Sequence, residues 1–175
     1  MNLSQFIRTI PDFPEPGIMF RDVTTLFGNR NAFKTMILSF EEVWKDQNID
    51  YIAGIDARGF IIGGALAHHL SVGFVPVRKK GKLPYKTIEE NYDLEYGTAT
   101  LELHTDAVSA GSQVLVVDDL IATGGTAEAA AKLIEKSGGK VAAFIFVINL
   151  FDLGGKDLLE KKGYKCFSLI DFPGH

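Results

Sequence analysis

Hydrophobic and polar positions along this chain follow two different periods. From Asn31 to Asp46, apolar side chains return every three or four residues, which predicts a helix capped by Asn31 with Trp44 in the core. Shorter apolar runs predict buried strands at residues 51–55, 73–77, 98–104, 113–117, 141–150 and 164–170. Helical patterns between them predict helices at residues 60–70, 126–136 and 156–162.

Alternation of strands and helices predicts an α/β fold with a mainly parallel sheet and helices on its faces. The length of 175 residues suits one domain covering the whole chain. Three prolines and a glycine, Pro11, Pro14, Pro16 and Gly17, predict that the first 30 residues are irregular. Ligands of parallel sheets bind at the carboxyl ends of the strands, so we expect the functional residues there.

Composition narrows the class of protein. Residues are 46% hydrophobic and 23% charged, which is typical of a globular domain, and the net charge of −4 argues against general nucleic-acid binding. Cys166 is the only cysteine, which excludes an internal disulfide and a cysteine-rich zinc site, and the four histidines show no metal-ligand spacing. The start lacks the apolar core of a signal peptide, and the longest apolar run, residues 141–148, is too short to cross a bilayer. We therefore expect a cytoplasmic protein that binds no membrane.

The strongest chemical pattern lies in residues 114–126. A buried strand ends in two adjacent carboxylates, Asp118 and Asp119, and a short loop then opens a helix; the loop consists of Ala122, Thr123, Gly124, Gly125 and Thr126. Backbone N–H groups of such a loop at a helix N-terminus can bind a phosphate. Because carboxylates repel a phosphate, we expect these two to hold ribose hydroxyls or a divalent cation that the ligand carries. The alternative is a solvated acidic loop before an ordinary helix cap; P-loop and dinucleotide-binding glycine motifs are absent.

Basic and acidic residues are also clustered. Arg58 stands where a strand gives way to a helix, which suits anion binding, although a plain surface arginine is the alternative. Five of the nine residues from 78 to 86 are basic, which predicts a mobile loop over a phosphate site rather than a solvated face or a nucleic-acid patch. The acids that follow, Glu89, Glu90, Asp93 and Glu95, are expected to lie on a flexible and mostly solvated flap.

Residues 114–126 resemble the phosphoribosyl-pyrophosphate (PRPP) motif of type I phosphoribosyltransferases. Residues 13–22, 56–60, 78–84 and 94–97 are together similar to the members of that family that use adenine. The resemblance implies the type I fold, with a small N-terminal hood of about residues 1–30 contributing to the base pocket, a mobile flap loop and a homodimer. It also implies transfer of the phosphoribosyl group of PRPP to adenine, giving AMP and pyrophosphate in purine salvage, with Mg²⁺ held mainly by PRPP and no metal ligand directly assigned on the chain.

The resemblance assigns roles for PRPP residue by residue. Asp118 and Asp119 are expected to bind the ribose, and the loop from Ala122 to Thr126 the 5′-phosphate. Pyrophosphate is expected to contact Arg58, Arg78, Lys79 and Lys82, some of them across a dimer interface. Lys80 and Lys86 are assigned no direct contact and are expected to attract the anionic ligand through their charge. The resemblance also implies a cis peptide bond between Asp56 and Ala57.

On the purine side, Phe20 is expected to stack on the base, and Met19 and Arg21 to contact the adenine edge through their main chains. The resemblance of residues 94–97 implies that Glu95 is the catalytic residue, a role that suits a carboxyl group able to share a proton with a purine ring nitrogen. Tyr96 either closes over the site or packs the flap.

Three rival interpretations stay open at this point. One is a transferase of the same fold for hypoxanthine, guanine or xanthine, which a base-specificity assay distinguishes. Another is a non-catalytic regulator that binds PRPP or a purine, which pyrophosphate release with adenine would exclude. The third is an unrelated phosphate-binding α/β domain.

Overall fold

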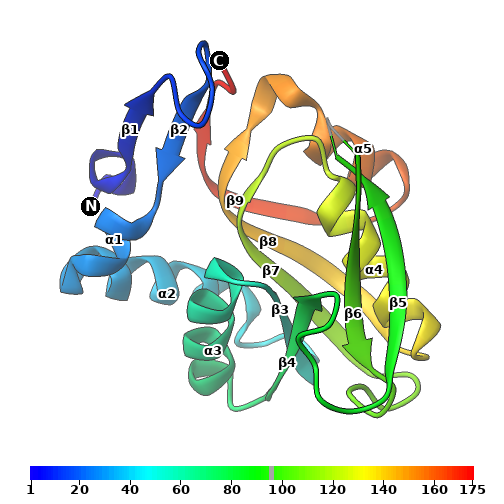
Figure 1. Cartoon of the computed structure of the whole chain (residues 1–175). Helices are drawn as coiled ribbons and strands as arrows, with labels where there is room; N and C mark the ends of the chain where they lie inside the picture. Colours follow the sequence, from blue (N-terminus) through cyan, green and yellow to red (C-terminus); the bar gives the residue numbers. More distant parts are fainter. Residues whose placement is uncertain (95–96) are drawn as a thin grey trace.

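The computed structural model describes residues 1–94 and 97–175 and has a seven-stranded sheet at its centre (Figure 1). The order across the sheet is β5-β6-β4-β3-β7-β8-β9. Its strands are β3 (Tyr51–Ile55), β4 (Gly73–Lys79), β5 (Thr87–Asp93), β6 (Thr98–His104), β7 (Gln113–Ile121), β8 (Lys140–Leu150) and β9 (Cys166–Phe172). The run from β4 to β9 is parallel, which confirms the predicted pairing, whereas β6 pairs antiparallel with both β4 and β5.

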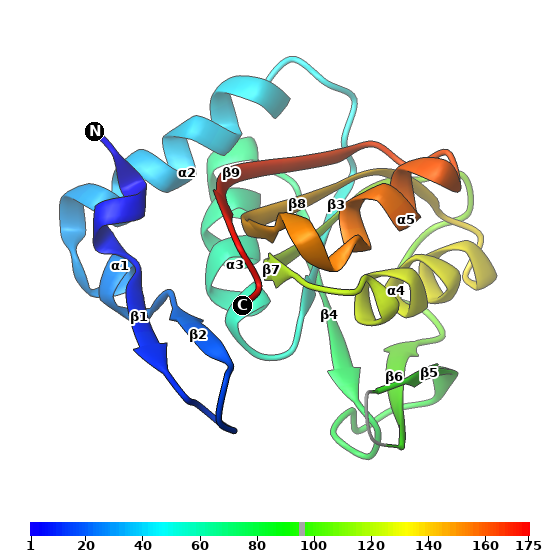
Figure 2. The same cartoon turned by 90° about the horizontal axis from the view of Figure 1, so that it is seen from above.

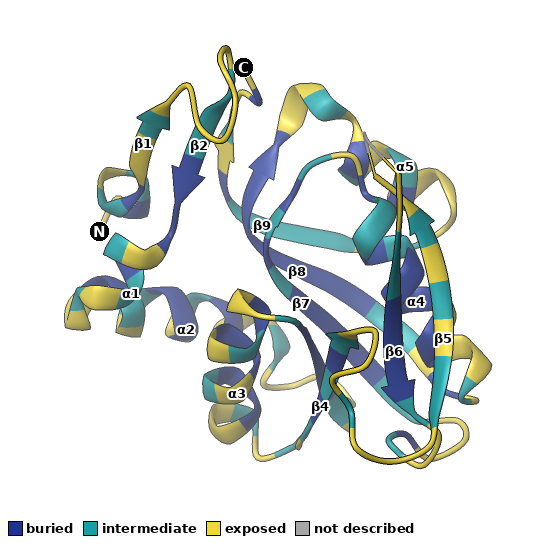
Figure 3. Ribbon diagram, in the orientation of Figure 1, coloured by how far each residue is buried: buried dark blue, intermediate teal, exposed yellow. Residues whose placement is uncertain are grey.

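Helices cover both faces of this sheet (Figure 2). On one face lie α2 (Arg30–Trp44) and α3 (Arg58–Leu70), and on the other α4 (Gly125–Lys136) and α5 (Gly155–Lys161). The two-residue period of a strand sends Leu115 and Val117 into the core under α2 and α3, and Val114 and Val116 into the core under α4. Figure 3 shows the resulting contrast between the buried strands β7 and β8 and the exposed strand β1.

The N-terminal residues are ordered, so the prediction that the first 30 are irregular was wrong. They form a 3₁₀ turn (Leu3–Phe6), the antiparallel strands β1 (Arg8–Pro11) and β2 (Met19–Asp22), and the short helix α1 (Thr24–Gly28). We call β1, β2 and the turn between them the N-terminal hairpin. The prolines and Gly17 lie in its turn or at a strand end, where the backbone N–H is not needed for pairing, and the Asp12 carboxylate accepts a hydrogen bond from the Gly17 N–H at 2.8 Å.

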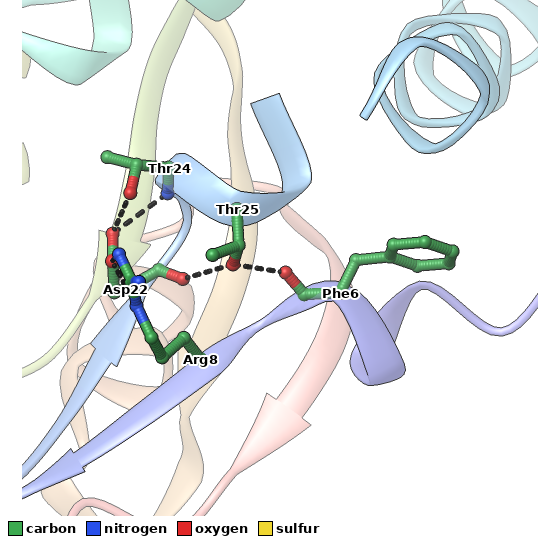
Figure 4. Close-up of polar contacts among 5 residues, drawn as sticks. All are labelled: Phe6, Arg8, Asp22, Thr24 and Thr25. Atoms are coloured by element: carbon green, nitrogen blue, oxygen red, sulfur yellow. Dashed lines mark hydrogen bonds and ion pairs between the residues drawn. The ribbon is translucent and has the colours of Figure 1, made fainter. Parts of the chain in front are cut away.

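Asp22 fastens this hairpin to α1 (Figure 4). One carboxylate oxygen accepts hydrogen bonds from the Thr24 hydroxyl at 2.6 Å and the Thr24 N–H at 2.9 Å, while the other pairs with the Arg8 guanidinium at 2.5 Å. The hydroxyl of Thr25 donates to the carbonyl of Phe6 at 2.6 Å. The Thr24 hydroxyl bond, helped by Arg8, lowers the pKa of Asp22 to about 2 against the opposing effect of burial.

Several predicted boundaries shift by a few residues. Helix α2 is capped by Asn29, whose side chain accepts from the N–H groups of Asn31 and Ala32, so the prediction of Asn31 as the cap was wrong. Trp44 is only partly buried and packs against the core from its edge. Within the described ranges, no helix combines the length and apolar character needed to cross a membrane.

Candidate active site

A cavity of about 170 Å³ lies beyond the carboxyl end of β7. It brings together Arg58, Asp118, Asp119 and the five loop residues that follow, all of which the sequence had singled out. The complete lining is Arg58, Asp118, Asp119, Leu120, Ile121, Ala122, Thr123, Gly124, Gly125, Thr126, Ala127 and Phe146. This position is the edge of a parallel sheet at which ligands are expected.

The loop from Ala122 to Thr126 takes its shape from Gly124 and from a neighbouring turn. Gly124 is the N-cap of α4 and has a φ of +92°, a conformation that residues with a Cβ rarely adopt. The carbonyl of Ala122 accepts a hydrogen bond from the N–H of Gly155 at 3.0 Å, which holds the loop against the start of α5. The first turn of α4 therefore faces the cavity with backbone N–H groups that the helix itself does not use.

The two acids have different partners. Asp119 is buried and forms an ion pair with Nε of Arg58, which stands at the first residue of α3. Asp118 accepts a hydrogen bond from the N–H of Asp119 at 2.8 Å and turns part of its surface to the cavity. Protein encloses the Asp118 carboxyl on its other sides, and this burial, reinforced by the charge of Asp119, raises its pKa well above the usual range.

The basic segment is only partly a loop, which corrects the sequence prediction. Arg78 and Lys79 end strand β4, and Arg78 donates to the carboxylate of Asp56 at 3.2 Å and to the carbonyl of Lys82 at 3.3 Å. The peptide bond between Asp56 and Ala57 is cis, as the family resemblance predicted. These contacts hold Arg78 beside the turn that leads into α3.

Glu102 is a residue of this region that the sequence analysis missed. It lies on β6 and is only 3% exposed, and its Oε1 accepts hydrogen bonds from the backbone N–H groups of Lys82 at 3.0 Å and Leu83 at 2.8 Å. The available signal in the sequence was a carboxylate between Leu101 and Leu103 within a predicted strand. A charged residue that is buried in a strand needs a hydrogen-bond or ion-pair partner, which points to a specific contact. Glu102 thus anchors the basic loop to the sheet.

The acids after the basic loop are also more ordered than predicted. Glu89, Glu90 and Asp93 belong to β5, which pairs with β6 along its whole length. Glu90 is half-buried and forms ion pairs with Lys132 and Lys136 of α4, so the described part of the predicted flap is a strand packed on a helix. Glu95 and Tyr96, the predicted catalytic and flap residues, lie outside the described residues.

A second cavity, of about 790 Å³, separates the N-terminal hairpin from the carboxyl edge of the sheet. It shares Arg58, Thr123 and Thr126 with the smaller cavity, so the two form one continuous site. Met19, Phe20 and Arg21, the residues predicted to contact the base, line it together, and the ring of Phe13 packs edge-on against Phe20. The complete lining is Ile18, Met19, Phe20, Arg21, Arg58, Asp93, Leu94, Leu120, Ala122, Thr123, Gly125, Thr126, Leu150, Leu153, Gly174 and His175.

The two cavities differ in chemistry. The smaller one presents helix-terminal N–H groups, hydroxyls and carboxylates, which suit a sugar phosphate. The larger one is bordered mostly by apolar side chains and suits a flat aromatic ring. Among residues 1–94 and 97–175, no group of three or more His, Cys, Asp and Glu side chains is placed to hold a metal ion.

The chain is similar to known proteins over almost its whole length. Residues 26–174 match the family model of the phosphoribosyl transferase domain, so the match begins after the N-terminal hairpin. The chain is 55% identical over 174 residues to the adenine phosphoribosyltransferase of Maricaulis maris, covering 99% of each chain.

Solved structures give the same result. The adenine phosphoribosyltransferase of Rhodothermus marinus superposes with a TM-score of 0.91 at 50% identity, covering 97% of this chain and 96% of that one. The enzyme of Saccharomyces cerevisiae, crystallised with adenine and an imino-altritol bisphosphate, superposes with a TM-score of 0.89 at 41% identity and 96% coverage of both chains.

Proposed function

The chain belongs to the phosphoribosyltransferase family, among its adenine phosphoribosyltransferases, and we propose that its two adjoining cavities hold PRPP and adenine for the transfer of the phosphoribosyl group. It is a glycosyltransferase with the type I fold. In the proposed reaction, the bond from C1 of the ribose to a pyrophosphate oxygen breaks and a bond from C1 to an adenine nitrogen forms. The products are AMP and pyrophosphate, as in purine salvage.

The sugar phosphate belongs in the smaller cavity. The N–H groups at the start of α4 and the hydroxyls of Thr123 and Thr126 would bind the 5′-phosphate, and Asp118 and Asp119 would accept hydrogen bonds from the ribose hydroxyls. The ion pair between Asp119 and Arg58 supports this arrangement, because it fixes a cation beside the carboxylates proposed to hold the ribose, where it could neutralise the leaving pyrophosphate.

Pyrophosphate is released toward the basic segment. Arg58, Arg78, Lys79 and Lys82 would neutralise its charge, some of them across the interface of a homodimer. The hydrogen bond from Arg78 to the main-chain carbonyl of Lys82 supports a placement of the basic loop next to the Arg78 side chain. Lys80 is already paired with Glu89 at 3.0 Å, in keeping with a role outside the direct contacts.

Adenine belongs in the larger cavity, next to Met19, Phe20 and Arg21 of β2. Phe20 would stack on the ring, while the main chains of Met19 and Arg21 read its edge. We assign Glu95 the proton exchange with a ring nitrogen, so Glu95→Gln should lower turnover by orders of magnitude with substrate binding largely kept. Tyr96 keeps its assignment to the flap.

We propose Mg²⁺ as the metal of this reaction, carried by PRPP. The carboxylates of Asp118 and Asp119 fit it, because Mg²⁺ prefers oxygen ligands and binds through few carboxylates together with substrate phosphates. When bound, it would neutralise the charge that develops on the leaving pyrophosphate.

We propose one phosphoribosyltransferase domain over residues 1–175, with about residues 1–30 as a hood over the base. The family-wide model begins at residue 26, whereas the adenine-specific relative aligns along nearly the full chain, which supports a role of the hood in choosing the base. The cytoplasmic location stays a prediction.

The observation that carries the proposal is the direct connection between a phosphate-binding cavity and an apolar one. Its test is an assay of purified protein with PRPP and Mg²⁺ and, in turn, adenine, hypoxanthine, guanine and xanthine. We expect pyrophosphate and the nucleotide to form with adenine. Turnover of an oxopurine alone would assign another base, and binding without turnover would indicate a regulator.

A further inference from the structure

The side chain of Arg21 bridges two parts of the chain that border the larger cavity. Its Nη1 donates to the hydroxyl of Thr9 on β1 at 2.7 Å, and its Nη2 donates to the carbonyl of Pro173 at 3.2 Å. The guanidinium also lies 4.6 Å from the ring centroid of Phe172 at the end of β9. Arg21 is only 9% exposed, so a buried charge makes these contacts, and its Nε has no hydrogen-bond partner among the described residues.

The segment that Arg21 holds is fixed from its other side as well. The N–H of Gly174 donates to the carboxylate of Asp152 at 2.6 Å. A Cβ on Gly174 would lie 2.6 Å from Cγ of Leu153, so a larger residue at this position requires Leu153 or the C-terminal segment to move. Residues 172–174 are therefore held between the N-terminal hairpin and the turn after β8.

This bridge lies between two walls of the larger cavity. Residues 18–21 of the hairpin form one wall, and Gly174 and His175 form part of another. The end of the chain lies near β2 of the hairpin, as the bond from Arg21 to Pro173 shows and as can be followed in Figures 1 and 2, although the two lie at opposite ends of the sequence. Arg21 is itself part of the hairpin wall, and its bond to the Pro173 carbonyl joins this wall to the segment that leads directly into Gly174 and His175.

We propose that the Arg21 side chain is a positioning residue that sets the width of the purine cavity by fastening β2 to residues 172–173. The inference rests on the proposed function, in which adenine binds in this cavity. It differs from the main-chain contact proposed for Arg21, because a side-chain substitution leaves the main-chain groups in place. Loss of the bridge should weaken purine binding and leave PRPP binding nearly unchanged, since the phosphate loop lies on the other side of the site.

The test compares Arg21→Met with Arg21→Lys, with Arg30→Met as the matched control at an exposed arginine. We expect Arg21→Met to raise the KM for adenine about tenfold while the KM for PRPP stays within about twofold, and Arg21→Lys to recover part of the loss. Arg30→Met should behave like the wild type. Melting temperatures of all variants show whether each one is folded.

Two further variants change the surroundings of Arg21 instead of Arg21 itself. Thr9→Val removes one acceptor of Arg21, and Gly174→Val displaces the C-terminal segment; both should raise the KM for adenine. Combining Gly174→Val with Arg21→Met should add little to either alone, because both break one bridge. If Arg21→Met does not fold, Thr9→Val and Gly174→Val decide the question.

An unchanged KM for adenine in folded Arg21→Met, or in both other variants, would overturn the inference. So would equal increases in the two KM values, which would indicate a general structural defect. A wild-type protein inactive with adenine would instead contradict the proposed function, before any variant is compared.

Discussion

Asp118 and Asp119 are neighbours in the sequence, but their carboxyl groups have different tasks. Asp119 is neutralised by Arg58 in a buried ion pair. Asp118 forms no ion pair among the described residues, and burial together with the charge of Asp119 outweighs the attraction of Arg58 and raises its pKa well above the usual range. A ribose hydroxyl donates a stronger hydrogen bond to an ionised carboxylate than to a neutral one, and a ligand-borne cation is attracted by the ionised form, so ligand binding should favour the ionised form of Asp118.

This difference predicts proton release when PRPP binds with Mg²⁺. A ligand that prefers the ionised carboxylate lowers its pKa, so affinity should rise with pH up to the raised pKa of the free enzyme. Asp118→Asn should weaken PRPP binding by about ten- to a hundredfold and remove this pH dependence. Calorimetry at one pH in two buffers with different ionisation enthalpies measures the released protons, and an equal proton count in the wild type and Asp118→Asn would contradict the prediction.

At the scale of elements, strand β6 supplies the hydrogen-bond acceptors that hold the basic loop. The carbonyl of Thr100 accepts from the N–H of Lys80 at 3.1 Å, Glu102 accepts from the N–H groups of Lys82 and Leu83, and Nε2 of His104 accepts from the N–H of Tyr85 at 3.3 Å. These β6 residues are spaced by two and therefore lie on one side of the strand. The loop is thereby held in place before any ligand arrives.

Glu102 is the buried acceptor among these β6 residues, so removing its carboxylate should loosen the loop. Glu102→Leu should raise the KM for PRPP about tenfold and change the KM for adenine little, because the loop carries the proposed pyrophosphate contacts. Glu102→Gln keeps one carbonyl oxygen as acceptor and should recover most of the effect. Steady-state kinetics measure both KM values, with Glu42→Leu at an exposed acid as the control. A Glu102→Gln variant as impaired as Glu102→Leu would indicate that the charge of Glu102 matters instead of its anchoring of the loop.

The turn between β2 and α1 depends on Asp22, whose pKa is lowered from 3.8 to about 2. A carboxylate with a lowered folded-state pKa stabilises the protein above its unfolded value, and this stability disappears as pH falls from about 4 to about 2. Asp22→Asn should therefore lower the free energy of unfolding by about 1 to 2 kcal/mol at pH 7 and flatten its pH dependence in that acidic range.

Urea denaturation at pH 7 and at pH 4 down to 2 measures this effect. Asp46→Asn, at an exposed acid, is the matched control and should change the free energy of unfolding little. A deficit of Asp22→Asn that is as large at pH 2 as at pH 7 would show that the pH-dependent stability does not come from this carboxylate.

For the whole molecule, the proposed homodimer can be tested at exposed apolar side chains. Leu38 and Val43 of α2 and Ile61 of α3 are between 40% and 49% exposed, and these two helices pack against each other. An interface formed by these helices would bury the three side chains.

Light scattering after size-exclusion chromatography should give a mass of about 38 kDa, twice the 19.2 kDa of the chain. Replacing Leu38 and Ile61 together by Asp should shift the mass toward that of one chain. A wild-type mass of 19.2 kDa at all micromolar concentrations would contradict the homodimer.

The sequence by itself determined the parallel part of the sheet, the helices on its faces and the glycine-containing loop after β7. Each of these features is local: hydrophobic period separates strand from helix, and a strand, two acids and a glycine-containing loop are contiguous from residue 114 to 126. The sequence did not predict edge strand β5, because its acidic residues show no apolar pattern. This strand is stabilised instead by pairing with β6 and by ion pairs from α4.

Only the tertiary structure decided which distant groups meet. Arg58 reaches Asp119, Glu102 reaches back to Lys82, and Arg21 joins β2 to Pro173, 152 positions away. No local pattern encodes such pairs, because partners far apart in the chain become neighbours only through the order and register of the strands between them. The same reason places the end of the chain in the wall of the larger cavity, although nothing in its own sequence indicates a site.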